Sequence, residues 1–180
     1  MKFKETNIPG VYEIDLFHLV DERGAFVKTF HKQSFVEQGL DSSFDESFYS
    51  TNHKGVVRGM HFQLPPDDHS KIVYCTSGSL IDVILDIRKN SPSYGQVAEI
   101  KLSGDNYKAA YLPKGVAHGF AVEEDNTCMV YLTSTMHSPA NDAGILWNSF
   151  GYKWPFDEVS NSERDKAFPS FKDFDSPFDY

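Results

Sequence analysis

The stretch Gly55-Val-Val-Arg-Gly-Met-His-Phe-Gln63 has the length and the apolar and aromatic content of a β-strand. Turn signals bound it on both sides, Asn52-His-Lys-Gly55 before it and Pro65-Pro66 after it. Runs of the same kind recur along most of the chain. The predicted strands span residues 10–18, 44–51, 56–63, 71–77, 80–88, 96–102, 108–112, 118–122 and 128–134. Many short strands separated by turns are typical of an all-β protein, and we predict a jelly roll or β-barrel.

The remaining segments predict only small additions to this β-structure. Short helices are expected at residues 32–38 and within 160–167, where Ser162 and Asp165 have the spacing of a capping box. The C-terminal tail, residues 168–180, carries four Phe residues, and we expect it to pack on the barrel or on a partner subunit because exposing it to water is costly. With 180 residues and no linker or repeat, the chain is expected to be a single domain, 1–180.

Charge and cysteine content narrow the class of protein. The formal net charge of −9, without any Lys/Arg-rich block, argues against nucleic acid and anionic membranes as partners. No signal-peptide pattern or run of about 20 apolar residues is present, so we expect a cytoplasmic location. Cys75 and Cys128 lie in strand-like runs without metal-binding spacing, and we expect buried free thiols.

The opening stretch is also the first sign of function. A strand that only buries one face does not need Arg58, His61 and Gln63 together, with Lys71 eight residues further on. The two-residue period of a strand places Arg58 and His61 on opposite faces. The two side chains can enter one cavity only if the strand has a local bulge, and Gly59 between them is the residue that would permit one.

Three later motifs add complementary chemistry. Pro113–Phe120 contributes His118, Met129–Thr133 contributes Tyr131, and Ser162-Glu-Arg-Asp165 contributes a carboxylate. Lys71 and Tyr131 are both expected to point into the barrel. Together with His61 they supply a base, an acid, an orienting group and anion-binding cations.

These motifs, in this order, resemble the family of nucleotide-sugar 3,5-epimerases typified by dTDP-4-dehydrorhamnose 3,5-epimerase. The similarity runs from Asp21-Glu-Arg-Gly24 to Arg164-Asp165 and includes Ser70-Lys-Ile-Val73, Ser91-Pro-Ser-Tyr-Gly95 and Trp147-Asn148. It implies a cupin-type jelly roll and an isomerase that needs no metal and no cofactor. The implied reaction inverts C3, C5 or both in a 4-keto-6-deoxyhexose linked to a nucleoside diphosphate.

The resemblance also implies roles for individual residues. It assigns His61 as the base with Asp165 as its carboxylate partner, Lys71 as the cation beside the keto oxygen and Tyr131 as the proton donor. It implies a homodimer, in which the segment around Arg23 and Phe26 lines the neighbouring site. The implied substrate-binding residues are Arg23, Phe26, Lys28, Glu46, Arg58, Gln63 and His118, with Arg23 and Arg58 on the diphosphate and His118 near the pyranose or phosphate.

The chain departs from the family pattern at positions that face the nucleotide. Lys28 stands where Glu is common, Glu46-Ser-Phe-Tyr-Ser50 replaces a Gln-Asp-Asn-His-Ser run, and Met136-His137 replaces a Tyr-Tyr pair. A CDP- or GDP-linked sugar is therefore an alternative to the dTDP-linked one. The sequence leaves open which carbon is inverted, and whether the sugar enters a cell-surface polysaccharide such as an O-antigen or a glycosylated metabolite.

The residues alone are also compatible with different functions. A metal-dependent cupin would usually carry a second histidine where this chain has Gln63. A non-catalytic sugar-nucleotide-binding module, a C3-only epimerase and a 3,4-ketoisomerase of the same fold would each share many of these residues. Asp82 either orients a sugar contact or forms a salt bridge with Arg88 or Lys89. His118 could instead be a turn residue, and Tyr131 could instead be a core residue.

Overall fold

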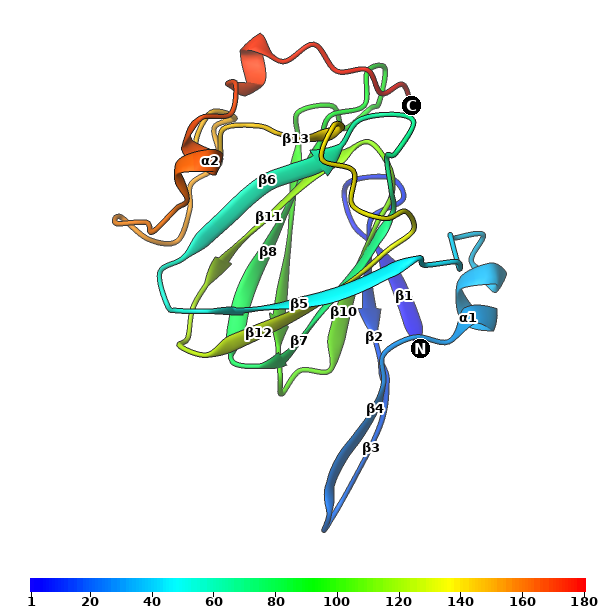
Figure 1. The fold of residues 1–180 in the computed structure, drawn as a ribbon. Helices are drawn as coiled ribbons and strands as arrows, with labels where there is room; N and C mark the ends of the chain where they lie inside the picture. The colour runs from blue at the N-terminus through cyan, green and yellow to red at the C-terminus, as the bar shows by residue number, and fades with distance from the viewer.

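The computed structural model describes residues 1–180 and shows two antiparallel sheets packed face to face as a jelly roll, which confirms the predicted all-β class (Figure 1). One sheet has six strands in the order β1-β2-β10-β7-β12-β5: β1 (Lys2–Glu5), β2 (Tyr12–Asp15), β10 (Lys108–Leu112), β7 (Lys71–Ser77), β12 (Thr127–Thr133) and β5 (Glu46–Asn52). The other has five in the order β13-β6-β11-β8-β9: β13 (Asp142–Gly144), β6 (Val57–Gln63), β11 (Val116–Val122), β8 (Ser79–Asp86) and β9 (Val97–Ser103).

The predicted strands agree with the observed ones within a few residues, apart from the first. Residues 10–18 form two elements, β2 and the start of β3 (Phe17–Asp21), because Leu16 turns inward and its amide donates to the carbonyl of Tyr107. Strands β1, β13 and β4 (Gly24–Lys28) were not predicted from the sequence. These strands are short and carry little of the alternation by which a half-buried strand is recognised.

The main core lies between the two sheets. Residues on alternating positions of β8, β9 and β12, among them Leu80, Ile84, Ile100 and Met129, are almost completely buried there. A separate cluster, around Phe35 of helix α1 (Lys32–Glu37), covers the outer face of the six-stranded sheet. The six-stranded sheet therefore has side chains packed against both of its faces.

The C-terminal tail packs on the barrel, as predicted. After helix α2 (Glu163–Lys166) the chain runs past β13 and β6 through the short 3-10 turn η1 (Phe171–Asp173), seen in orange and red in Figure 1. Phe174 and Phe178 both stand edge-on to Phe62 of β6, with ring centroids 5.2 and 5.9 Å away. The tail thus buries the outer face of the five-stranded sheet that carries the opening stretch.

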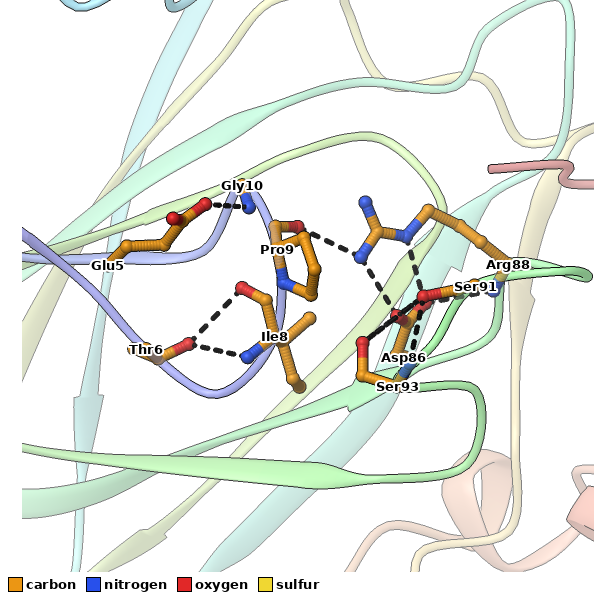
Figure 2. A network of polar contacts seen from close by, with 9 residues as sticks. All are labelled: Glu5, Thr6, Ile8, Pro9, Gly10, Asp86, Arg88, Ser91 and Ser93. Atoms are coloured by element: carbon orange, nitrogen blue, oxygen red, sulfur yellow. Dashed lines mark hydrogen bonds and ion pairs between the residues drawn. The ribbon is translucent and has the colours of Figure 1, made fainter.

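A buried ion pair closes the end of β8 (Figure 2). The fully buried Asp86 accepts hydrogen bonds from the Arg88 side chain and from the hydroxyls of Ser91 and Ser93, the latter two at 2.6 Å. Arg88 also donates to the carbonyl of Pro9 at 2.9 Å. Burial alone would raise the pKa of Asp86, but these donors lower it. The network ties the N-terminal loop to the β8–β9 connection, and Arg88 therefore pairs with Asp86, not with Asp82.

Strands β3 and β4 form a separate two-stranded hairpin that extends away from the body of the molecule (Figure 1). Its apolar side chains are exposed, with Leu19 at 59% and Phe26 at 58%. No helix in the chain combines the length and the apolar content needed to cross a bilayer. Of the two free cysteines, Cys75 is buried as expected whereas Cys128 is only half-buried.

Candidate active site

A cavity of about 270 Å³ lies between the two sheets and contains most of the residues singled out from the sequence. Strands β5, β7 and β12 form one wall, and β6 and β11 form the other. Its lining includes Glu46, Phe48, Ser50, Arg58, His61, Gln63, His69, Lys71, His118, Tyr131, His137, Asp142 and Arg164. Cationic, acidic and neutral polar side chains from the two sheets therefore line the same cavity.

Strand β6 has a bulge at the position where Gly59 would permit one, and both Arg58 and His61 line the same cavity. His118 of β11 pairs with His61 while Phe120 pairs with Arg58, so β6 has one extra residue in this interval. The extra residue is accommodated at Gly59, whose φ is +137°. A Cβ placed there would lie 2.6 Å from the Cα of Gly119. Only glycine allows β6 and β11 to approach this closely.

His61 and Asp165 form a hydrogen-bonded pair in the cavity wall. His61 Nε2 lies 2.8 Å from Asp165 Oδ1, and the amide of Gly59 donates to the other oxygen at 3.1 Å. Ser162 caps α2 by accepting from the Asp165 amide, as the capping-box spacing predicts, and thereby fixes the carboxylate. A carboxylate only accepts, so Nε2 carries the proton of the neutral ring and Nδ1 is left as the free basic nitrogen.

The electrostatics of this pair favour a neutral imidazole beside an ionised carboxylate. Burial lowers the pKa of His61, and the hydrogen bond that His61 donates to Asp165, which acts in the opposite direction, does not offset it. For Asp165, burial acts to raise the pKa, but the bonds from His61, Gly59 and Ser162 outweigh it and the net shift is downward. His61 is thus available as a base in the neutral range.

Arg164, which the sequence analysis quoted only as part of a motif, also borders this pair. Its guanidinium forms an ion pair with Asp142, stacks on the ring of Phe168 at 5.0 Å, and comes within 3.5 Å of His61 Nε2. Its charge contributes to the lowered pKa of His61. Its position next to Asp165 in the sequence was the available signal.

Lys71 enters the cavity from β7, as predicted. Its Nζ lies 3.4 Å from the main-chain oxygen of His61. Burial lowers the pKa of Lys71 to about 8, while Asp82 and Asp142 act in the opposite direction. The ammonium group is therefore present at neutral pH and incompletely paired.

Tyr131 faces His61 from the other sheet and is 8% exposed. Its ring stacks on Phe48 with centroids 4.6 Å apart, and its hydroxyl lies 3.4 Å from Ser50 Oγ. Burial raises the pKa of the phenol, so the group holds its proton. Tyr131 is therefore a wall residue of the cavity, with its hydroxyl beside that of Ser50.

His118 belongs to β11, so its interpretation as a turn residue is wrong. Its Nε2 lies 2.7 Å from Asp82 Oδ1, and both residues are almost completely buried. Neither of the two interpretations of Asp82 from the sequence, a sugar contact or a salt bridge with Arg88 or Lys89, describes this contact. The pair repeats the His–carboxylate arrangement of His61 on the neighbouring strand.

Three further predicted residues line the cavity, and each is held in place by hydrogen bonds within the protein. Arg58 Nε donates to Asn52 Oδ1 at 2.8 Å. Glu46 accepts from the amide of His137 at 2.7 Å. Gln63 has its amide engaged on both sides, donating to the carbonyl of Asp67 and accepting from the amide of Ser138, each at 2.7 Å. Gln63 thus holds two rim loops in place.

Arg23, Phe26 and Lys28 do not reach the cavity of their own chain. All three lie on the exposed β3–β4 hairpin, where Arg23 forms an ion pair with Asp21 at the tip. Lys28 stands 5.7 Å from the ring of Phe17. In a single chain these residues are separate from the site.

Comparison with known proteins gives a consistent result. The family model described as dTDP-4-dehydrorhamnose 3,5-epimerase matches residues 5–173. A dTDP-4-dehydrorhamnose 3,5-epimerase of Shigella flexneri is 36% identical, over 97% of this chain and 98% of its own length. The RmlC epimerase of Mycobacterium tuberculosis superimposes with a TM-score of 0.91 at 36% identity, covering 96% of this chain and 90% of that one. An RmlC protein of Legionella pneumophila, solved in complex with dTDP-4-keto-L-rhamnose, gives 0.92 at 30% identity and covers 97% and 94%.

Proposed function

The chain belongs to the dTDP-4-dehydrorhamnose 3,5-epimerase family of carbohydrate isomerases, and we propose that it inverts C3, C5 or both in a dTDP-linked 4-keto-6-deoxyhexose. The observation behind this proposal is the convergence of the His61–Asp165 pair, Lys71 and Tyr131 on one cavity. These groups cover the chemical requirements of inversion next to a ketone: removing a proton, holding the enolate and returning a proton to the opposite face.

His61 is the base in this proposal. Its free Nδ1 takes the proton from the carbon next to the keto group, and the resulting imidazolium is stabilised by Asp165 at 2.8 Å. The hydrogen bonds that Asp165 receives from Gly59 and His61 hold the ring in the tautomer with Nδ1 unprotonated. The histidine and the aspartate have the same roles in the triad of a serine hydrolase, where the aspartate orients the histidine and stabilises its protonated form.

Lys71 stabilises the enolate. When the C–H bond breaks, its electron pair moves into a new C=C bond and the carbonyl oxygen becomes negatively charged. A partly paired ammonium in a largely buried position interacts strongly with such a charge, because little water screens it. A positive Lys71 below about pH 8 meets this need.

Tyr131 is the proton donor for the second face. It projects from β12 while His61 projects from β6, so the two groups approach a sugar ring from opposite sheets. A phenol whose pKa is raised by burial retains its proton until the enolate carbon accepts it. Inversion follows because the proton leaves on one side and arrives on the other.

For the nucleotide, the relatives favour dTDP. The matching family and its curated members carry dTDP in their names, and the Legionella protein was solved with a dTDP-sugar. The CDP and GDP alternatives have no comparable support. We assign the departures at Lys28, Glu46 and Met136-His137 to a different set of contacts with the same nucleotide.

The active form in this proposal is a homodimer, because the hairpin β3–β4 pairs with no further strand of its own chain. Strand β5 is an edge strand of the six-stranded sheet and most of its side chains are exposed. An unpaired edge is a ready site for additional strands, and exposed Leu19 and Phe26 give the hairpin an apolar surface to bury. A two-fold dimer would carry Arg23 and Phe26 to the partner's cavity mouth.

Proton NMR in deuterated water tests the reaction. Wild-type protein with a dTDP-4-keto-6-deoxyhexose is expected to lose the C3 or C5 proton signal and to form the inverted sugar. His61→Ala is expected to abolish both changes, and Tyr131→Phe is expected to block inversion. CDP- and GDP-linked sugars serve as competing substrates. Absence of exchange with every donor contradicts the proposed reaction.

Complementation tests the dimer. His61→Ala and Arg23→Ala are each expected to be inactive, and mixing them should restore activity, because one cavity of a heterodimer then has both native residues. Mixtures as inactive as the separate variants would show that Arg23 serves the cavity of its own chain, and an active Arg23→Ala variant would show that Arg23 serves no site.

A further inference from the structure

A continuous set of polar contacts connects Tyr131 with Arg58 and is not explained by the roles described so far. Tyr131 Oη lies 3.4 Å from Ser50 Oγ, Asn52 Nδ2 donates to Ser50 Oγ at 3.1 Å, and Arg58 Nε donates to Asn52 Oδ1 at 2.8 Å. Ser50 and Asn52 are two residues apart on β5 and share one face of that strand. The cavity is lined by Tyr131, Ser50 and Arg58.

The orientation of Asn52 is determined by its neighbours. Arg58 Nε is a donor only, so the atom facing it must be the amide oxygen. The carbonyl of Thr127 is an acceptor only, and it lies 3.1 Å from the amide nitrogen. Asn52 is 4% exposed, so its amide is shielded from water. Its second N–H therefore points to Ser50, where it is shared between the hydroxyl oxygen at 3.1 Å and the main-chain carbonyl at 3.2 Å.

The direction of the Ser50 hydroxyl follows from this arrangement. Ser50 Oγ accepts from Asn52, and its own proton has Tyr131 Oη as the one remaining partner among the hydrogen bonds of the structure. Ser50 thus donates to Tyr131 whenever the tyrosine oxygen needs a donor. The chain of donors runs from Arg58 through Asn52 and Ser50 to Tyr131, each group polarised by the previous one.

We propose that Ser50 and Asn52 form a relay that stabilises the negative charge on Tyr131 at the moment it gives up its proton. This inference rests on the proposed function. In that step the O–H bond of Tyr131 breaks, the C=C electron pair of the enolate forms the new C–H bond, and the carbonyl is restored. The O–H electron pair remains on Tyr131 as a phenolate, which solvent reprotonates before the next turnover.

The separations are consistent with this use. The 3.4 Å contact between Ser50 and Tyr131 is long for a neutral pair of hydroxyls, and a hydrogen bond to a charged oxygen is shorter and roughly twice as strong. The bond therefore strengthens as the phenolate forms, which is what lowers a barrier. Burial raises the pKa of Tyr131, whereas Ser50 and Arg58 act to lower it. Ser50 and Asn52 are positioning residues, because they act through Tyr131.

The relay gives Arg58 a second task. As a diphosphate-binding cation it would hold the substrate, and through Asn52 it would also make Tyr131 a better proton donor. Both tasks need the guanidinium in the same place, where the hydrogen bond to Asn52 fixes its Nε. Its Nη groups remain free for oxygen atoms of the substrate.

The test compares deuterium exchange with inversion in deuterated water. His61 alone carries out removal and return of a proton on one face, so exchange with retention does not need Tyr131, whereas inversion does. Ser50→Ala is expected to slow inversion roughly ten- to hundredfold, the effect of losing one hydrogen bond to a charged group, while exchange and KM stay close to wild type. Ser50→Thr keeps the hydroxyl and should restore inversion. Thr51→Ala, on the exposed face of the same strand, is the matched control.

Asn52→Asp provides a second measurement that removes the N–H without removing volume. The aspartate draws the Ser50 proton away from Tyr131, so inversion should again fall relative to exchange. An equal fall in exchange and inversion in these variants, or wild-type inversion in Ser50→Ala, overturns the relay. A wild-type protein without any exchange overturns the proposed function itself and the relay with it, so the two failures are distinguishable.

Discussion

Replacing Asp165 with asparagine keeps the shape of the side chain and removes one acceptor, and we expect it to inactivate the enzyme through the tautomer of His61. The two oxygens of Asp165 each accept one hydrogen bond, from the Gly59 amide at 3.1 Å and from His61 Nε2 at 2.8 Å. Asparagine has a single oxygen. The Gly59 N–H is fixed in the backbone of the bulge and can only donate, so the oxygen is expected to stay with Gly59.

The amide nitrogen then faces His61, and two donors cannot share a hydrogen bond. The imidazole must move its proton from Nε2 to Nδ1, which places a hydrogen on the nitrogen that we propose as the base. The same change in a serine-protease triad lowers kcat about 10⁴-fold through the wrong tautomer. We expect a loss of about 10³- to 10⁴-fold in kcat, with KM within a few-fold of wild type.

The assay is the rate of deuterium exchange next to the keto group at pH 7, together with circular dichroism to confirm the fold. Glu163→Gln is the matched control, because it removes the same charge from the same helix at a side chain that is 90% exposed. Asp165→Asn retaining more than about a tenth of wild-type exchange would refute the reasoning, since it would mean that the Asp165 contact does not set the tautomer of His61.

Three other predictions follow from the same contacts. The value of kcat/KM should fall at acid pH as His61 is protonated, at a pH below the ordinary histidine pKa of about 6.5. It should also fall at alkaline pH as Lys71 loses its proton near pH 8. The variant Lys71→Arg should remove the alkaline fall even if it lowers the rate. Gly59→Ala should cost about 3 kcal/mol or more in urea unfolding, because the new Cβ meets the β11 backbone at a φ that L-residues rarely adopt, and an unchanged midpoint would contradict the close approach. Asp86→Ala should cost about 3–5 kcal/mol in the same experiment by leaving Arg88 buried without its partner, whereas Asp175→Ala, in an exposed pair, should leave the midpoint unchanged.

Strand positions were predictable because each strand carries its own signal. Alternating apolar residues and turn residues identified β6, β7 and β10 from local sequence alone. The bulge was predictable for the same reason, since Gly59 separates two polar residues that would otherwise face opposite sides. The hairpin β3–β4 was harder to predict from the sequence. Its apolar residues are exposed in the single chain, so the pattern has no buried face to report.

The contacts that the sequence analysis missed are contacts between strands. Asp82 meets His118 because β8 and β11 pair in a particular register, and Ser50 meets Tyr131 because β5 and β12 do. The two-residue period of a strand shows on which face of the sheet a residue lies. It does not show which residue lies opposite on the next strand, and a register shift of one residue changes every such pair. Arg164 was overlooked because its role comes from the turn that brings α2 against β6, which no local pattern specifies.

The two-sheet architecture suits a reaction that handles protons on both faces of one ring. Facing sheets in a sandwich are about 10 Å apart, which leaves a layer between them that a pyranose can occupy. His61 stands on one sheet with its supporting carboxylate from α2 behind it, and Tyr131 stands on the other with Ser50 beside it. His61 and Tyr131 therefore have different immediate partners, Asp165 for His61 and Ser50 for Tyr131. Because those partners do not overlap, changes to Asp165 should act on deprotonation and changes to Ser50 on reprotonation, and the effects of the two on exchange and inversion should be separable in a double variant.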